Sequence, residues 1–252
     1  MPYCDSHCHL TAPQFDADRE EVIARAQGAG VACLVSCGSD LASSAAEADL
    51  TAQHEGLYAA VGIHGHQASS ALRPDGTLDE RAFRRLADLA RRPGVVAIGE
   101  IGLDYHYDFS PRDAQRAVLA RQLALAADLG LPVILHNRES DEDLVRVLEA
   151  GPAGIRGVLH CFLADRPLAD WAVARGLYIG VAGPITFRNA RTLPDVIRSV
   201  PPERLLIETD SPYLSPHPLR GRRNEPAHVV HVARRLAEVL GQPPERIAEQ
   251  TA

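Results

Sequence analysis

Short apolar runs alternate with amphipathic stretches along almost the whole chain, and this alternation restricts the fold more than any other feature. The apolar runs predict eight strands, at residues 2–9, 31–37, 57–63, 95–101, 131–136, 156–161, 177–182 and 204–209. Helical patterns lie between them, for example at residues 15–30, 78–92, 113–130, 141–151 and 225–241. Eight strands alternating with helices favour one parallel (β/α)8 TIM barrel over an open doubly wound sheet. No GxGxxG turn follows the first strand, which also weighs against the open sheet.

The length and composition agree with a single domain over residues 1–252. A (β/α)8 barrel usually takes about 250 residues, and the hydrophobic content of 46% is ordinary for a globular chain. No window approaches the ~18 uninterrupted apolar residues of a membrane span. The N-terminus lacks the basic and apolar segments of a signal peptide. We therefore expect a cytoplasmic protein without membrane contacts, and a monomer.

Six potential metal ligands each close one of the apolar runs. They are spread along the chain but stand at equivalent strand ends: His7, His9, Glu100, His136, His160 and Asp210. His7 and His9 lie two positions apart, so both imidazoles share one face of a strand. A buried carboxylate without a partner is costly, which makes a metal ion an economical partner for Glu100 and for Asp210. The pattern predicts a metal site at the strand ends and suggests metal-dependent hydrolysis.

The charged residues narrow the chemistry further. All 26 basic residues are arginine, so a Schiff-base lysine, a P-loop lysine and a carboxylated lysine that bridges two metals are all excluded. If two ions share a ligand, a carboxylate must supply it, and Glu100 is the best placed. The net charge of −7 argues against broad contact with duplex nucleic acid. It leaves room for a small pocket that takes one end of a strand.

The motifs around these residues resemble the TatD family of metal-dependent deoxyribonucleases, within the wider amidohydrolase barrels. The resemblance runs almost end to end through DSHCHL, GIHGH, AIGEIGLDYHYDFSPRDAQ, LGLPVILHNR, GVLHCF and ERLLIETDSPYLSP. Gly65 stands where the family usually has proline, and Leu163-Ala164 replaces the common Ser-Gly. The chain also stops at EQTA, where the family continues, so we expect the last helix to lack its end.

The resemblance implies the site residues and their roles. It implies two divalent ions, zinc, manganese or magnesium, held by the six residues named above and bridged by Glu100. The ions would activate a water that attacks phosphorus, and Asp210 would position it and accept its proton. Asp5, Asp104 and Glu208 are expected to orient ligands. The expected substrate contacts are His64, His66, Arg138, Tyr105, Arg222 and Arg223.

Three functions are compatible with this pattern. The first is a nuclease that degrades DNA stepwise from the 3′ end of a single strand, or degrades RNA. The second is a deacylase, amidase or phosphoesterase for small molecules, and the third is a metal-binding protein without catalysis. Fold and metals alone do not separate the first two. The family resemblance and the arginines near the expected site favour the nuclease, and the intact ligand set disfavours the third.

Overall fold

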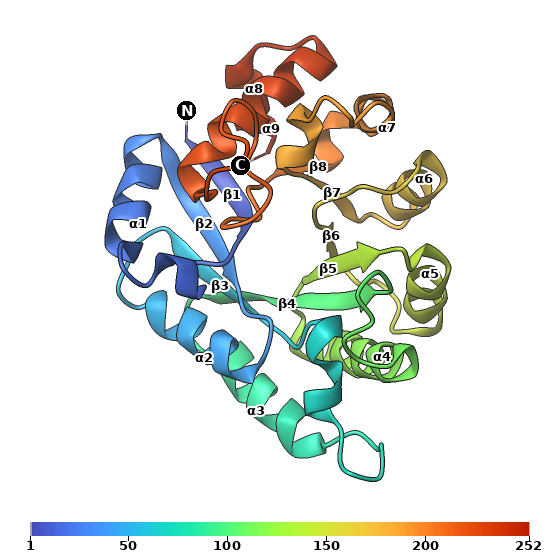
Figure 1. Cartoon of the computed structure of the whole chain (residues 1–252). Coiled ribbons are helices and arrows are strands. Elements are labelled where there is room, and N and C mark those ends of the chain that lie inside the picture. The colour runs from blue at the N-terminus through green and yellow to red at the C-terminus, as the bar shows by residue number, and fades with distance from the viewer. Residues whose placement is uncertain (1, 252) are drawn as a thin grey trace. The chain divides into compact units, whose positions relative to one another are not determined.

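The computed structural model describes residues 2–251, which form two compact units (Figure 1). One unit combines residues 2–36 with residues 160–251, and the other comprises residues 37–159. Within each unit, neighbouring strands follow the chain order and run parallel. None of the helices in the described part of the chain is long and apolar enough to span a bilayer.

The first unit carries both ends of the chain. Its strands are β1 (Tyr3–Cys8), β2 (Val31–Cys37), β7 (Tyr178–Val181) and β8 (Leu205–Ile207). Its α-helices are α1 (Arg19–Gly28), α6 (Arg166–Ala174), α7 (Leu193–Ser199), α8 (Val229–Leu240) and α9 (Pro244–Gln250). Short 3-10 helices stand at η1 (Pro13–Phe15), η3 (Gly183–Thr186), η4 (Pro202–Arg204) and η5 (Pro226–His228).

The apolar face of α8 forms the core of this unit. Val232 and Leu236 are fully buried, and α8 packs against β1 and β8. The last described helix, α9, packs on α8 and β1 and buries Ile247 completely. The apolar residues of α9 therefore contribute to the same core as α8.

The second unit has four strands and four α-helices. The strands are β3 (Leu57–Val61), β4 (Val95–Asp104), β5 (Val133–Arg138) and β6 (Gly157–Leu159). The helices are α2 (Leu41–Leu50), α3 (Glu80–Ala90), α4 (Arg112–Leu129) and α5 (Asp141–Ala150), with the 3-10 segment η2 (Gly65–Ala71). Ile63, Phe83 and Val118 are buried together in its core.

The predicted strands are all present, but only β2 has the predicted bounds: β4 is longer, β5 is shifted by two residues, and the other five are shorter. β4 continues past residue 101 to Asp104, because Leu103 pairs with Asn137 and Asp104 pairs with Arg138 on β5. β6 is shorter than residues 156–161, and its three residues pair with β5. The longer β4 carries the chain from Glu100 to Asp104 in extended form, and this places both carboxylates beside β5. The single domain over 1–252 stays a prediction.

Candidate metal site

In the first unit, backbone bonds between the ends of β1 and β8 bring three potential ligands together. The amide of Asp210 donates to the carbonyl of His7 at 2.9 Å, and the amide of His9 donates to the carbonyl of Ser211 at 2.8 Å. Asp210 has a φ of 56°. Aspartate and asparagine adopt this left-handed conformation more readily than most residues. The turn aims the Asp210 carboxylate at the two imidazoles.

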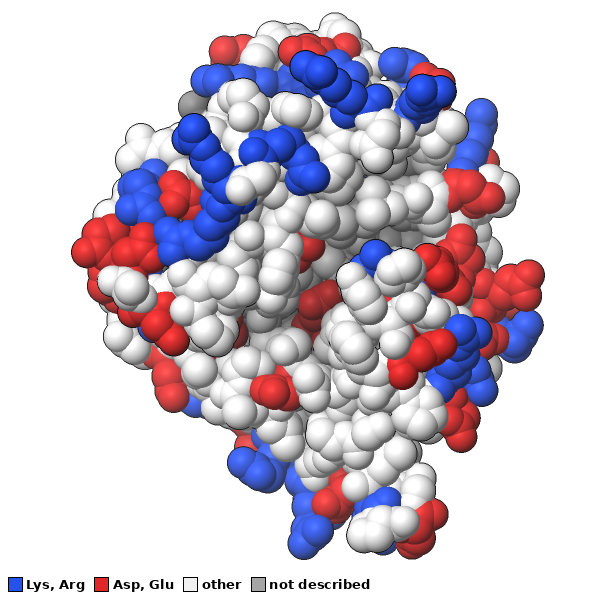
Figure 2. Space-filling view, viewed as in Figure 1, with Lys and Arg blue, Asp and Glu red and all other residues white. Residues whose placement is uncertain are grey.

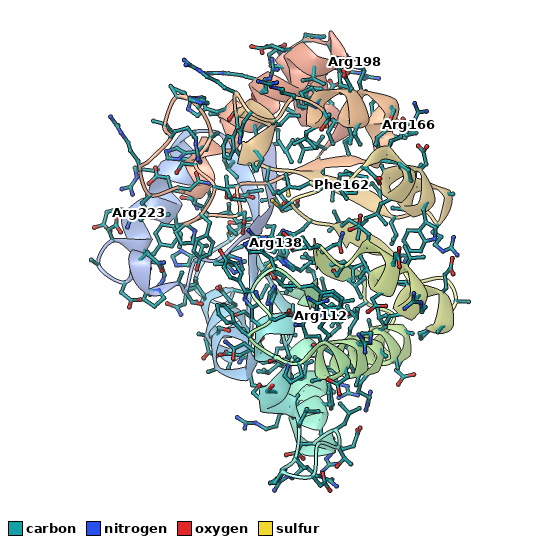
Figure 3. The ribbon with its side chains drawn as sticks, turned by 45° about the vertical axis from the view of Figure 1, so that its right-hand side comes forward. Arg112, Arg138, Phe162, Arg166, Arg198 and Arg223 are labelled. Atoms are coloured by element: carbon teal, nitrogen blue, oxygen red, sulfur yellow. The ribbon has the colours of Figure 1, made fainter. Side chains whose placement is uncertain are left out.

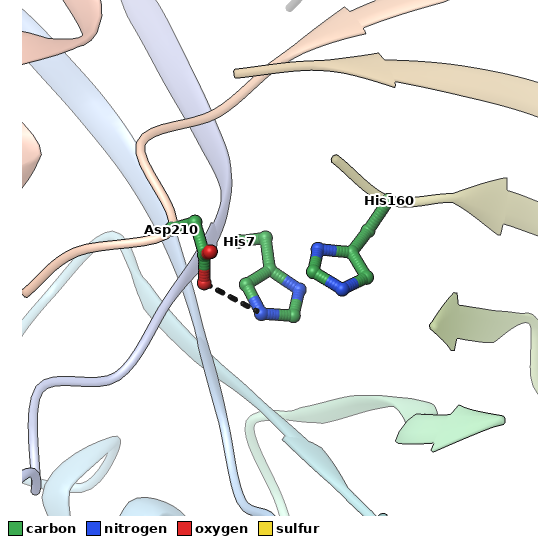
Figure 4. A group of neighbouring side chains, drawn as sticks. All are labelled: His7, His160 and Asp210. Atoms are coloured by element: carbon green, nitrogen blue, oxygen red, sulfur yellow. Dashed lines mark ion pairs between the residues drawn. The ribbon is translucent and has the colours of Figure 1, made fainter. Parts of the chain in front are cut away.

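The nitrogen and oxygen atoms of this group have the spacing of ligands around one ion. The Nε2 atoms of His7 and His9 are 3.1 Å apart, and Oδ1 of Asp210 lies 3.7 Å and 3.5 Å from them. Tetrahedral ligands about 2.0–2.1 Å from zinc lie roughly 3.3 Å from one another. The His160 ring stacks on His7, with centroids 3.9 Å apart (Figure 4). His7, His160 and Asp210 thus form a donor set that fits a divalent cation.

Two buried carboxylates hold this group in place. Asp5 accepts hydrogen bonds from the Thr209 amide at 2.9 Å and the Thr209 hydroxyl at 2.6 Å, directly before Asp210. Burial raises the pKa of Asp5 well above its ordinary value, although the bonds from Thr209 act in the opposite direction. Glu208 accepts from the Cys161 amide at 2.6 Å and lies 3.3 Å from Nδ1 of His160. A carboxylate at Nδ1 leaves Nε2 of the ring for an ion.

In the second unit, the register of β4 and β5 brings Glu100 and His136 together. His136 pairs with Gly102, and its Nδ1 lies 2.8 Å from the Glu100 carboxylate. The Nε2 atom of the same ring lies 3.1 Å from Asp104. If Nε2–H donates to Asp104, the lone pair on Nδ1 faces the Glu100 carboxylate. Two acceptors at this distance are satisfied by a shared proton or by a metal ion, and Glu100 and His136 belong to a group whose spacing fits an ion.

Asp104 organises the surroundings of His136. It accepts from the amides of His106 and Tyr107, both at 3.0 Å, and its Oδ2 lies 3.0 Å from Nε2 of His66. Burial opposes the charged form of Asp104. The hydrogen bonds from His136 and Tyr107 outweigh burial and hold the pKa below its usual range. Asp104 is therefore an anion that fixes His136 and ties it to the following loop.

His64 joins Glu100 and His136 in a second candidate donor set, but its hydrogen bonds favour another role. Burial lowers the pKa of His64 to about 4, despite the opposing effect of Glu100, so the ring is neutral at pH 7. The His66 amide donates to its Nδ1 at 3.0 Å, which leaves the proton on Nε2. Nε2 lies 3.3 Å from Glu100. We interpret His64 as a donor to the Glu100 carboxylate, not as a metal ligand.

The other predicted substrate contacts lie in different environments. Arg138 is exposed, with its guanidinium 4.8 Å from the centre of the Tyr107 ring. Tyr105 is only 9% exposed, and its hydroxyl donates to Asp143 at 2.7 Å. The aromatic rings that this loop does expose are those of Tyr107 and Phe109. The sequence pattern Y-x-Y-x-F, in which alternate residues are aromatic, indicates an aromatic cluster in this loop. Of its three rings, only that of Tyr105 is among the predicted substrate contacts.

The arginine loop after β8 also divides into different roles. Arg222 is exposed, whereas Arg223 donates to both oxygens of Asp18 at 2.7 Å and to the Gln14 carbonyl at 2.6 Å. Figure 3 shows Arg223 beside the segment that leads into α1. The Arg223 guanidinium is committed to this internal pair, which leaves Arg222 as the better candidate for a phosphate.

Charges of both signs are interspersed on the face shown in Figure 2. Ion pairs of this kind include that between Arg223 and Asp18. This mixture agrees with the net charge of −7. It fits local contacts with a substrate better than a broad basic surface.

Comparison with known proteins identifies the relatives of this chain. A family profile described as TatD related DNase matches residues 4–252. The chain belongs to the TatD-related DNase family. It is 41% identical to the "Uncharacterized metal-dependent hydrolase YabD" of Bacillus subtilis (strain 168), over 98% of this chain and 94% of the relative. It is 37% identical to the "3'-5' ssDNA/RNA exonuclease TatD" of Escherichia coli (strain K12), over 94% and 91%.

A solved structure of a TatD-family protein supports the fold. The crystal structure of the TatD homologue YJJV from Escherichia coli K12 matches with a TM-score of 0.89 and 32% identity, over 98% of this chain and 94% of that one. The predicted (β/α)8 TIM-barrel class is confirmed, as is the assignment to the TatD family of metal-dependent hydrolases. The roles of individual site residues stay predictions.

Proposed function

We propose that this TatD-family chain is a metal-dependent exonuclease that removes nucleotides from the 3′ end of single-stranded DNA. One observation supports metal-dependent hydrolysis most directly. The imidazole nitrogens of His7 and His9 and a carboxylate oxygen of Asp210 lie as far apart as the ligands of a single metal ion. The Escherichia coli relative named as a 3'-5' ssDNA/RNA exonuclease supports the substrate. RNA is the second substrate that this proposal admits.

The proposal includes two divalent ions. His7, His9, His160 and Asp210 would hold one ion, and Glu100 and His136 would hold the other. When bound, such ions supply Lewis acidity, which makes water a better nucleophile near neutral pH and offsets phosphoryl charge. Imidazole-rich donor sets suit zinc or manganese better than magnesium. The bridging role of Glu100 stays a prediction from the family resemblance.

The chain's own residues carry the remaining chemistry. Asp210 is the proposed proton acceptor, because its carboxylate faces the imidazoles and its backbone is held by two hydrogen bonds, to His7 and from Tyr213. Asp5 positions it through Thr209. His64 donates to Glu100 and keeps that carboxylate oriented. Arg138 is exposed, and no described carboxylate forms an ion pair with it, so its fork of N–H groups is available for a phosphate.

The substrate experiment compares labelled nucleic acids at saturating metal. Single-stranded DNA labelled at the 5′ end should give a ladder that shortens from the 3′ end, with mononucleotides released. Single-stranded circles of the same sequence should stay intact, because a circle offers no end. Cleavage of the circles would overturn the exonuclease assignment. Turnover of simple amides or small phosphoesters, without any cleavage of DNA or RNA, would support the small-molecule function instead.

The remaining parts of the proposal concern the state of the protein. We propose a single domain, a monomer and a cytoplasmic location. Light scattering coupled to size-exclusion chromatography would show one species near 27.2 kDa. A larger species would contradict the monomer, and cell fractionation with a tagged chain would test the location.

A further inference from the structure

The loop between β4 and α4 exposes two aromatic rings side by side. Tyr107 is 50% exposed and Phe109 is 68% exposed. Their rings are nearly parallel, at 4°, with centroids 5.2 Å apart. Exposed aromatic surface forgoes the free energy of burial, so a paired and ordered aromatic patch on a surface suggests a ligand.

The surrounding contacts hold both rings in one orientation. The Tyr107 amide donates to Asp104, and the Arg138 guanidinium lies over one face of the Tyr107 ring, 4.8 Å from its centroid. The His66 ring meets both aromatics edge-on, with centroids 5.7 Å from Tyr107 and 4.9 Å from Phe109. Rings that are already fixed lose little conformational entropy on binding. The patch is therefore prepared to stack against a flat group.

The patch connects directly to the donor atoms of the second unit. Asp104, which accepts from the Tyr107 amide, also lies 3.1 Å from His136 and 3.0 Å from His66. A ligand on the two rings is thus close to His136, with the positive charge of Arg138 on the same patch. Flat apolar faces beside an unpaired guanidinium match a base with its phosphate.

We propose that Tyr107 and Phe109 form a stacking site for a nucleobase of the single-stranded substrate, and that Arg138 binds a phosphate of the same strand. This inference rests on the proposed exonuclease function and names how the strand is held. Stacking on an aromatic ring contributes roughly 5- to 140-fold in binding per base. Every base has a π-face, so the site tolerates all four bases and requires only that a base is present.

The first test separates binding from chemistry. The change is Tyr107→Ala with Phe109→Ala, and the matched control is Tyr58→Ala, which removes another partly exposed aromatic ring of the same unit. We expect KM for single-stranded DNA to rise at least fivefold in the double variant, with kcat within about twofold of wild type. Cleavage of an oligomer of abasic deoxyribose phosphates, which offers the two rings no flat group, should not change. Tyr107→Phe should restore the KM, because it keeps the ring.

The second test locates the base. Oligonucleotides with one abasic nucleotide at successive positions from the 3′ end are bound to metal-free enzyme and followed by fluorescence anisotropy. At one or two positions, the abasic site should weaken binding to the wild-type enzyme. It should not weaken binding to the double variant any further, because removing the base and removing the two rings delete the same stacking contact. Additive losses at every position would overturn the proposal, as would an unchanged KM or an equal loss in Tyr58→Ala.

The two tests distinguish a failure of the stacking site from a failure of the proposed exonuclease function. If wild-type enzyme degrades DNA but the double variant has wild-type KM, the stacking site fails and the nuclease stands. If wild-type enzyme cleaves no nucleic acid and the anisotropy assay shows no binding, both fail. A wild-type dimer that the double variant converts to monomer would assign the patch to self-association and overturn the stacking site.

Discussion

Replacing Asp210 by asparagine tests the centre of the proposed chemistry. Asparagine keeps the volume and the tolerance for the left-handed conformation, where Asp210 has a φ of 56°. The bonds that hold the turn, from the Asp210 amide to His7 and from the Tyr213 amide to the Asp210 carbonyl, use only backbone atoms. We therefore expect a native fold. The charge and the proton-accepting oxygen are lost, and turnover should fall by about 10²-fold or more.

An alanine variant separates the structural effect from the chemical effect. Alanine in the left-handed region costs roughly 1–2 kcal/mol. For 252 residues, an unfolding entropy of about 2.1 cal/mol/K per residue converts this cost to roughly 2–4 °C in Tm. Asp210→Ala should thus melt about 2–4 °C lower than Asp210→Asn, while both lose activity. Differential scanning calorimetry and single-turnover cleavage measure the two effects.

The metal content decides what the lost activity means. Both variants are assayed at saturating manganese or zinc, and bound metal is measured by mass spectrometry. A loss of turnover that persists at full metal occupancy identifies Asp210 as the proton acceptor. Recovery at high metal would reduce its role to a ligand. Turnover near that of wild type in Asp210→Asn, with native melting, would refute the mechanism.

Other perturbations give separable results. Exhaustive chelation should abolish DNA cleavage and added divalent ions should restore it; full activity in verified metal-free protein would contradict a metal site. Arg222→Ala should lower the slope of log affinity against log salt concentration by about 1 without changing Tm. A slope equal to that of wild type would show that Arg222 contacts no phosphate. Arg223→Ala should mainly lower Tm, because the ion pair with Asp18 is lost. Arg223 and Arg25 hold the pKa of Asp18 at about 2, below its unfolded value, so the stabilisation is complete above about pH 5 and disappears as the pH falls toward 2. The Tm difference between wild type and Asp18→Asn should follow that course, and a difference independent of pH would show that charge is not its cause.

The repeated strand–helix pattern could be predicted from the sequence because it is local. Alternation of apolar side chains and helical periodicity determine which face of each element is buried, whatever the neighbours are. The same rule predicts that the imidazoles of His7 and His9 lie close together, and their Nε2 atoms are 3.1 Å apart although β1 ends at Cys8. The local pattern of apolar residues therefore predicts the positions of the eight strands and shows which potential ligands stand near the strand ends.

Contacts between distant residues decided what the sequence left open. β4 extends to Asp104 because β5 supplies pairing partners, and a strand's length depends on such partners. The pair between Arg223 and Asp18, 205 residues apart in the chain, cannot be predicted from the local sequence, and the role of Arg223 as a substrate contact stays a prediction. Similarly, nothing local distinguishes Tyr105 from Tyr107 and Phe109. Their exposure depends on Asp143, Arg138 and His66, which come from other elements, so only the tertiary structure determines which rings can meet a ligand.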